Sequence, residues 1–229
     1  ASKPVGVFGG HQRTTLPVAF VGQLNSRDYL IEQMSPVGTW GKSAFVTPFA
    51  RSSNEQDVGT DLYRVVAAFD STAVLVDGVF QVLMNVGQIF ESALTQAAAI
   101  TTSRPALTAQ FKKTSGTPSG GSNQRVGDPL MMLVPPAEQF MSEYRFINVQ
   151  SYEYNGSINT PSPIYGEQYL NIVIPTSGIG GLTLDGLPVS PGRFQQLAQT
   201  PYSWTQIVMS DGVHHVKGDT TFGIYVYGY

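Results

Sequence analysis

Two stretches of this chain, "RVVAAFDSTAVLVDG" (Arg64–Gly78) and "IVIPTSGIGGLTLDG" (Ile172–Gly186), follow one plan. Each has an apolar β-branched run, a small polar segment, a second apolar run and an Asp-Gly pair, which suits a turn because both residues tolerate left-handed backbone. Aligned without a gap, Val65 falls on Val173 and the two Asp-Gly pairs coincide. We therefore expect a repeated pair of strands, joined in the first copy as a hairpin through Asp70-Ser71.

A further strand-like segment follows each copy and would close the unit. It is "SRPALTAQF" (Ser103–Phe111) after the first copy and "DTTFGIYVYGY" (Asp219–Tyr229) after the second. A related word, "SKPVGVFGG" (Ser2–Gly10), opens the chain with no hairpin before it. We interpret residues 1–10 as the closing strand of a truncated preceding unit, with Lys3–Phe8 completing a sheet here.

The composition favours strands throughout. The chain has 24 glycines and 15 prolines, which interrupt helices, and only 13% of its residues are charged. In "FQVLMNVGQIFE", Val82, Met84 and Val86 alternate and predict one buried face. "ESALTQAAAITTS" is expected to be extended despite its alanines, because the β-branched residues Ile100–Thr102 and the nearby Pro105 disfavour a helix.

The fold class we predict is all-β, with two lobes of β-sandwich or barrel type built from the repeated hairpin-plus-closing-strand unit. Residues 1–10 form the orphan closing strand, and 11–60 form a connecting segment that contains "EQMSPVGTWGK". Residues 61–150 form the first lobe and 151–229 the second. Long polar loops are expected at 51–61, 112–128 and 151–168, where they would face a partner.

Charge and cysteine content exclude several classes of function. The formal net charge is −3 and the basic residues are scattered, so we expect no nucleic-acid partner. No apolar run approaches the ~20 residues of a membrane span, and no membrane insertion is expected. The chain has no cysteine, which excludes disulfides, thiolate metal sites and cysteine nucleophiles. No cofactor and no metal are expected.

Four stretches carry a resemblance to a known family. They are "FGGHQRTTLP" (Phe8–Pro17), "RDYLIEQMSPVGTWGKSAFVTPF" (Arg27–Phe49), "GDPLMMLVPPAEQF" (Gly127–Phe140) and the terminal "FGIYVYGY". In this order they resemble the IgG-Fc-binding protein N-terminal domain family, over nearly the whole chain. The resemblance implies a secreted or cell-surface protein, as in mucus, marine adhesive and bacterial surface proteins. It does not by itself extend immunoglobulin binding to this chain.

One departure from the family concerns cysteines. Animal mucus members have cysteines near a "GHxC" word and before "DxLxEQ", where this chain has Arg13 and Asn25-Ser26. The resemblance therefore implies that a disulfide of those members is absent here, and packing must hold this loop.

The candidate binding residues are aromatic. Trp40 offers a large contact area and one N–H donor, which suits recognition, and it suits equally an anchor in a core or between lobes. Tyrosines on polar loops suit glycan or protein recognition at low entropy cost. The tyrosine candidates are Tyr152, Tyr154, Tyr165 and Tyr169.

Other marked residues are expected to be structural. His11 follows two glycines, and its imidazole is expected to hydrogen-bond nearby backbone. Glu32, with Lys42, is expected to serve backbone groups around Trp40, beside Gly41. Asp128 and Pro129 are expected to turn the chain before a buried strand. The neighbours His214 and His215 would point to opposite faces of a strand, which disfavours a shared metal.

Three functions follow from these patterns. The first is a non-enzymatic extracellular binding or adhesion module that presents loops to a protein or glycan. The second is a self-assembling subunit of a filament, matrix or lattice, in which neighbouring copies exchange the N-terminal strand. The third is a hydrolase or metal enzyme using His11 and Glu32, which would need a metal or a cleft that joins them.

Overall fold

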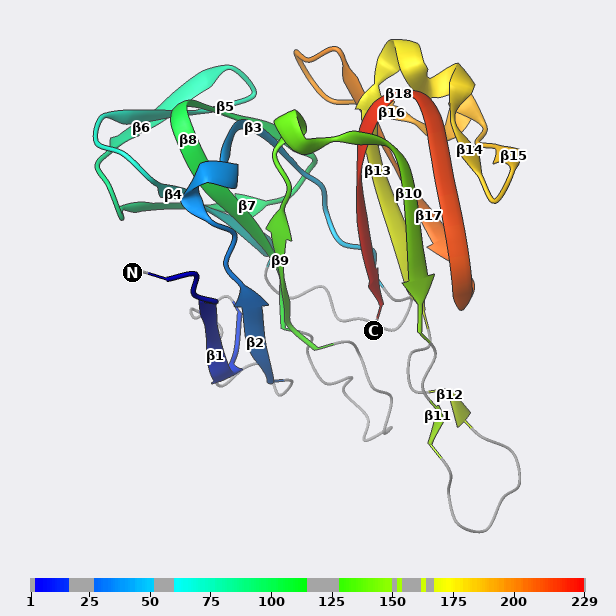
Figure 1. The fold of residues 1–229 in the computed structure, drawn as a ribbon, viewed down its shortest axis with the longest axis horizontal. Helices are drawn as coiled ribbons and strands as arrows, with labels where there is room; N and C mark the ends of the chain where they lie inside the picture. Colours follow the sequence, from blue (N-terminus) through cyan, green and yellow to red (C-terminus); the bar gives the residue numbers. More distant parts are fainter. Residues whose placement is uncertain are drawn as a thin grey trace. The chain divides into compact units, whose positions relative to one another are not determined.

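The chain is all-β, as its composition predicts (Figure 1). The computed structural model describes residues 3–16, 27–51, 60–114, 128–149, 152–153, 162–163 and 167–228. Two units form, at 1–139 and 140–229. The boundary lies eleven residues before the one expected, because β10 (Met141–Asn148) pairs with the last strand of the chain, β18 (Gly212–Gly228), and so belongs to the second unit.

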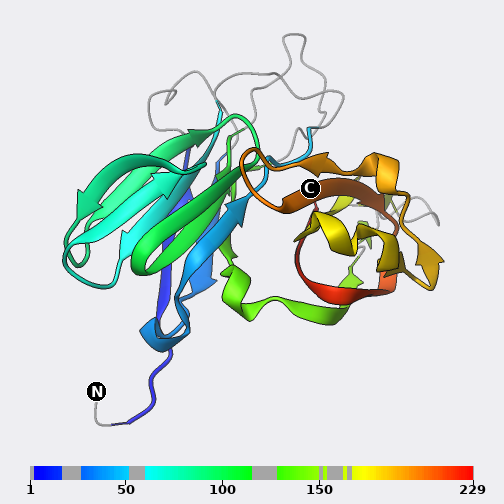
Figure 2. The same ribbon diagram turned by 90° about the horizontal axis from the view of Figure 1, so that it is seen from above.

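The first unit is a curled antiparallel sheet around β8 (Ala98–Lys112), a strand seen in green in Figure 2. The first half of β8 pairs with a strand on each edge, β3 (Gly41–Val46) and β5 (Thr72–Val76). The second half pairs with β4 (Asp61–Ala67) and β9 (Leu130–Val134). β6 (Val79–Met84) and β7 (Ile89–Leu94) take the outer positions in the order β6-β5-β8-β4-β7.

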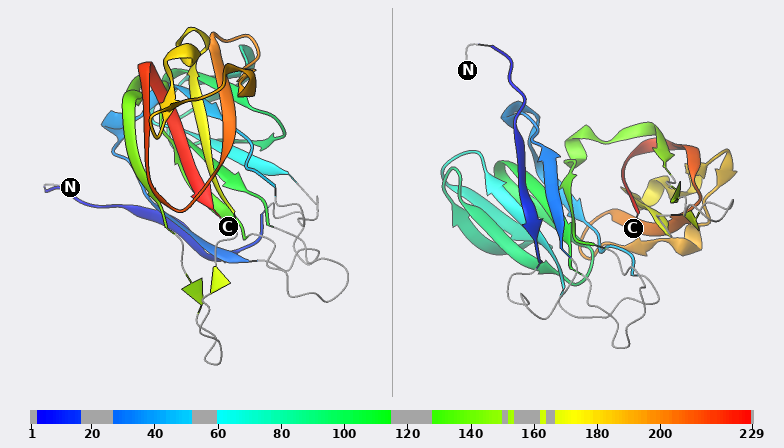
Figure 3. Two further views of the ribbon diagram at one scale, coloured as in Figure 1. Left: turned by 90° about the vertical axis from the view of Figure 1, so that its right-hand side faces the viewer. Right: turned by 90° about the horizontal axis from the view of Figure 1, so that it is seen from below.

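The second unit has the same plan around β18 (Figure 3). β10 and β14 (Thr183–Leu184) pair with the first half of β18, and β13 (Gln168–Pro175) pairs with the second half. β15 (Leu187–Pro188) pairs with β14, and β17 (Tyr202–Met209) lies between β13 and β16 (Gln195–Gln196). Two 3-10 turns, η4 (Thr176–Gly181) and η5 (Pro191–Arg193), connect these strands.

The repeat in the sequence is a repeat of this pairing plan. The two Asp-Gly pairs mark the same turn, since Asp77 and Asp185 have φ of 49° and 51° and the glycines that follow have φ of 78° and 80°. Asp77 donates its N–H to the carbonyl of Ala99, and its carboxylate accepts the Ala99 N–H, both at 2.9 Å. Asp185 makes the same two bonds with His215, both at 2.8 Å.

The expected hairpin through Asp70-Ser71 is wrong. β4 and β5 do not pair with each other, because each pairs with β8. The hairpin is β5–β6, turned by Asp77-Gly78, whose left-handed residues match the twist of paired strands. The expected burial of Val86 is also wrong: β6 ends at Met84, and Val86 is exposed in the turn that follows.

The ungapped alignment is one residue out of register at the first strand. Thr108 of β8 and Ile224 of β18 occupy corresponding positions in the two closing strands. Val65 opposes Thr108, and Ile172 opposes Ile224. Val65 therefore corresponds to Ile172, not to Val173. The connection that includes η4 is correspondingly one residue longer than its counterpart.

The start of the chain forms a ribbon of β1 (Phe8–Thr14) and β2 (Asp28–Gln33). The strand begins at Phe8, not at Lys3 as expected, and its described partner is β2. When Ser2 is aligned with Ser103, Val7 falls on Thr108. The Val7 carbonyl accepts the Met34 N–H at 2.8 Å, and Thr108 opposes Val134 of β9, so Met34 and Val134 occupy corresponding positions. The similarity of the words at residues 2–10 and 103–111 thus extends to the register of their partners. That residues 1–10 close a preceding unit stays a prediction.

Buried apolar side chains support each unit separately. In the first unit, Leu30 of β2 packs with side chains of the main sheet, Leu62 and Phe111 among them. In the second, Ile172, Val216 and Phe222 belong to one cluster with fully or nearly fully buried side chains. Within the described ranges, no helix is long and apolar enough to cross a membrane.

Candidate functional site

A pocket of about 320 Å³ lies beside Trp40 in the first unit. Its walls come from the 3-10 turn η2 (Val37–Thr39), the start of β3, the middle of β8 and the 3-10 turn η3 (Ala137–Gln139). The lining residues are Gly38, Thr39, Trp40, Gly41, Lys42, Pro105, Pro136, Glu138 and Gln139.

Two proline-initiated turns build this pocket. The Thr39 N–H donates to the Pro36 carbonyl, and the Gln139 N–H donates to the Pro136 carbonyl, both at 2.9 Å. Each proline fixes its own φ and so favours a tight turn directly after it. The two turns are tied together, because the Gln139 side-chain amide donates to the carbonyl of Thr39.

Gly41 allows the turns to approach each other. A Cβ at this position would lie 2.3 Å from Cβ of Pro136 and 2.5 Å from Oε2 of Glu138, closer than real side chains pack. Without a side chain at Gly41, Glu138 reaches the backbone and accepts the N–H of Lys42 at 2.8 Å. Lys42 thus contributes its backbone here, and its own side chain is exposed.

Trp40 is half-buried, with its indole N–H donated to the Ser35 carbonyl at 2.9 Å. This bond satisfies the one polar group of the ring and fixes its direction. The rest of the ring is left as an apolar wall of the pocket.

The second unit shows that this exposure is not required by the fold. With Pro36 aligned on Pro136, Trp40 corresponds to Phe140, and both aromatic residues precede a bulge in the pairing with the closing strand. Phe140 is buried, and its ring lies against Gly223, where a Cβ would come within 2.3 Å of Cε1. The residue that corresponds to Gly223 is Leu107, since Gly41 opposes Ala106 as Met141 opposes Phe222. A leucine there leaves no room for a ring placed like that of Phe140.

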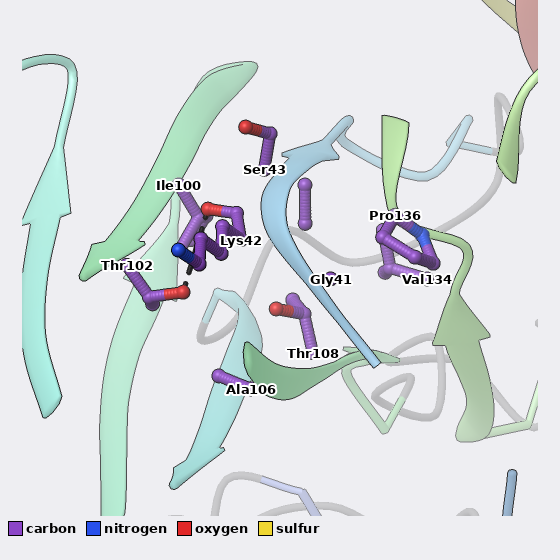
Figure 4. Close-up of a pocket in the computed structure, with 10 residues that line it drawn as sticks. Gly41, Lys42, Ser43, Ile100, Thr102, Ala106, Thr108, Val134 and Pro136 are labelled. Carbon is purple, nitrogen blue, oxygen red and sulfur yellow. Dashed lines mark hydrogen bonds between the residues drawn. The ribbon is translucent and has the colours of Figure 1, made fainter. Parts of the chain in front are cut away.

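A smaller cavity of about 10 Å³ lies next to the Trp40 pocket, between β3 and β8 (Figure 4). It shares Gly41, Lys42 and Pro136 with that pocket. Thr102 donates its hydroxyl to the Lys42 carbonyl at 3.4 Å, and Thr108 is on the same wall. A cavity of this size holds about one water molecule, so it is too small to be a second ligand site.

The tyrosine candidates are not gathered into one described surface. Tyr169 is buried on β13, where its ring stacks on Tyr227 at 5.5 Å and its hydroxyl donates to Glu167. It is thus a core residue and not the surface residue we expected, because its strand is central in the sheet. Tyr152 lies in the short strand β11 (Tyr152–Glu153), paired with β12 (Ser162–Pro163). Tyr154, Tyr165 and most of the three polar loops lie outside the described residues.

His11 and Glu32 lie on the β1–β2 ribbon, and neither lines the Trp40 pocket. His11 is exposed, and its Nδ1 accepts the Arg13 N–H at 3.1 Å. Glu32 is half-buried, and burial raises the pKa of its carboxyl group. Asp128 is exposed and Pro129 is buried just before β9.

The two adjacent histidines hydrogen-bond to separate carboxylate groups. His214 is buried, with Nδ1 2.8 Å from Asp185 and Nε2 3.0 Å from the Ser210 carbonyl. Burial alone would lower the pKa of His214, but these hydrogen bonds raise it above its ordinary value. The same hydrogen bond lowers the pKa of Asp185. His215 Nε2 lies 2.7 Å from Glu143, and that hydrogen bond lowers the pKa of Glu143. In the portion of the chain that the structure describes, no three His, Asp or Glu residues are placed to hold a metal ion.

No sequence pattern described above singles out Pro136, Glu138 and Gln139 as pocket residues. A signal for them exists, since "PVGTW" (Pro36–Trp40) and "PAEQF" (Pro136–Phe140) share a proline four residues before an aromatic residue. Recognising that spacing as part of the repeat would have placed the second turn, but not its contact with the first.

Two curled β-units with a shallow pocket walled by an aromatic ring have the features of a binding module. The family model described as IgGFc binding protein matches residues 1–228, and the chain belongs to this family. The resemblance seen in the sequence is thereby confirmed. No curated protein and no solved structure matches the chain.

Proposed function

We propose that this chain is an extracellular or cell-surface module that binds a protein partner, with the Trp40 pocket as part of the contact surface. The observation that carries the proposal is the partial exposure of the Trp40 side chain, whereas the corresponding Phe140 is buried. The family description, which names IgG Fc as a ligand of the family, supports a protein as the partner.

The chemistry of the pocket suits a side chain inserted from a partner. The ring of Trp40 and the rigid rings of Pro105 and Pro136 provide apolar walls that lose little conformational entropy on binding. Glu138 and Gln139 are held by hydrogen bonds to backbone groups, so the rim is ordered before a ligand arrives. Lys42 and Glu138 carry opposite charges, which favours a ligand without strong net charge.

A glycan is the alternative occupant of the same pocket, because a flat ring bordered by hydrogen-bonding groups also fits a sugar. The polar loops at 51–61, 112–128 and 151–168 remain a separate candidate contact surface for either partner. A binding screen must therefore include proteins, immunoglobulin Fc among them, and glycans.

The test uses the fact that the chain has two tryptophans, Trp40 and Trp204. A Trp204→Phe variant leaves Trp40 as the sole indole reporter and serves as the matched control. Ligands from a protein and glycan array are titrated against this variant and against Trp40→Ala. We expect the fluorescence of Trp40 to shift on binding, and Trp40→Ala to weaken affinity at least about tenfold, as for a central aromatic contact. Unchanged affinity in Trp40→Ala would remove this pocket from the binding surface.

A further inference from the structure

The edge strand β6 has several exposed apolar side chains. Residues 79–90, "VFQVLMNVGQIF", contain neither a charged residue nor a proline. Val79 and Phe80 are each 60% exposed and Leu83 is 58% exposed. Val86 and Ile89, which follow in the turn and at the start of β7, are also exposed.

The backbone of β6 is open along one side. β6 ends the strand order of its sheet and pairs with β5 (Figure 1). Among the residues that the structure describes, no backbone hydrogen bond reaches its outer edge. An edge of this kind is a template for another strand unless the sequence protects it.

The second unit shows how the same edge is protected. The corresponding strand β15 has two residues, Leu187 and Pro188, and proline has no N–H to donate to an added strand. β6 has six residues and no proline, and its one irregularity is the bulge in its pairing with β5 at Val74/Leu75. Since both units follow one plan, the fold itself does not require the longer strand.

We propose that β6 is a homotypic docking edge, at which β6 of a second copy adds in antiparallel orientation about a two-fold axis. Because β6 has no charged residue, a charged partner would gain no ion pair from it. A second, identical β6 offers backbone donors and acceptors for the open edge and apolar side chains that match those of the first copy. Val79, Phe80 and Leu83 expose about 100 Å² each and would bury at most roughly 600 Å² over two copies, below the size of standard interfaces, so the added backbone hydrogen bonds must supply much of the affinity. The dimer is therefore weak and depends on concentration.

This inference uses none of the residues that line the Trp40 pocket, so it can fail without affecting the proposed function. It also differs from exchange of the N-terminal strand, because β1 and β2 take no part in it.

Sedimentation velocity from about 1 to about 100 μM tests the proposal on the full chain. The wild type is expected to shift towards a dimer across this range. Phe80→Lys and Leu83→Lys place a charge on the edge and are expected to remain monomeric. Leu187→Lys is the matched control, because Leu187 is 71% exposed on the corresponding strand β15, and it should dimerise like the wild type.

Far-UV circular dichroism and Tm verify that each variant is folded, and two independent β6 variants guard against the misfolding of one. Amide hydrogen exchange adds a local readout, since Val79–Met84 should gain protection at high concentration. A wild type that stays monomeric at about 100 μM overturns the proposal. So does a dimer that survives both β6 substitutions, or one that Leu187→Lys disrupts equally.

Discussion

Replacing Gly41 by alanine should destabilise the first unit and distort the pocket. An added Cβ would sit 2.3 Å from Cβ of Pro136, about 1 Å closer than a tight carbon contact, and 2.5 Å from Oε2 of Glu138. The Pro136 ring is rigid, so the backbone of a turn must move to relieve the contact. Overpacking of this kind costs about 1–3 kcal/mol.

The chain supplies its own control. Gly38 lies in the turn η2 just before Trp40, and a Cβ there would meet no atom within 4 Å. Gly38→Ala therefore changes the unfolded chain in the same way as Gly41→Ala but adds no contact.

Differential scanning calorimetry and urea unfolding measure both variants, with Trp40 fluorescence in the Trp204→Phe background reporting on the pocket. We expect Gly41→Ala to lower Tm by about 2–12 °C, from about 1–3 kcal/mol at about 2–4 °C per kcal/mol for a chain of this size. Gly38→Ala should stay within about 1 °C of the wild type or rise slightly. Equal Tm values for Gly41→Ala and the wild type, or an equal loss in Gly38→Ala, would refute the proposed close approach.

Two other predictions concern the second unit's ion pair and the repeated turn. The raised pKa of His214 means that its contribution to stability is fully present below about pH 6.5 and is lost as the pH rises through its folded-state value. The lowered pKa of Asp185 means that its contribution is present above about pH 4 and is lost on acidification. Tm measured from pH 5 to 8.5 should thus fall less steeply on the alkaline side in His214→Asn than in the wild type, and parallel slopes would contradict this account. At the turn, Asp77→Ala removes the acceptor for Ala99 and places alanine at a positive φ, so it should cost about 2–3 kcal/mol in urea unfolding. Asp77→Asn keeps an acceptor and tolerates that φ, so it should cost under about 1 kcal/mol, and equal losses in the two variants would count against the turn geometry.

Local chemistry made part of this fold predictable. The two Asp-Gly words predicted turns, and both turns have the left-handed residues that such pairs favour. The segments at 103–111 and 219–229 are predicted from the sequence as closing strands, and residues 103–111 and 219–228 lie in long strands that organise their sheets. These signals depend on the conformations open to a few neighbouring residues, so the sequence carries them directly.

The pairing of the strands was harder to predict from the sequence. β4 and β5 adjoin in sequence, and a hairpin was the natural expectation, yet each pairs with β8. Tyr169 looks like a loop-borne aromatic residue in sequence and is buried in the centre of a sheet. Neither outcome is encoded by spacing, because a strand gains its partners from segments far along the chain.

The sequence by itself determined the all-β class, the repeat, the Asp-Gly turns and the family. The tertiary structure decided that Trp40 is partly exposed while its counterpart Phe140 is buried, and that β6 presents an open edge where β15 is short. Turns and strand tendency follow from local backbone preferences. Exposure depends instead on which distant residue faces a side chain, here Leu107 in one unit and Gly223 in the other.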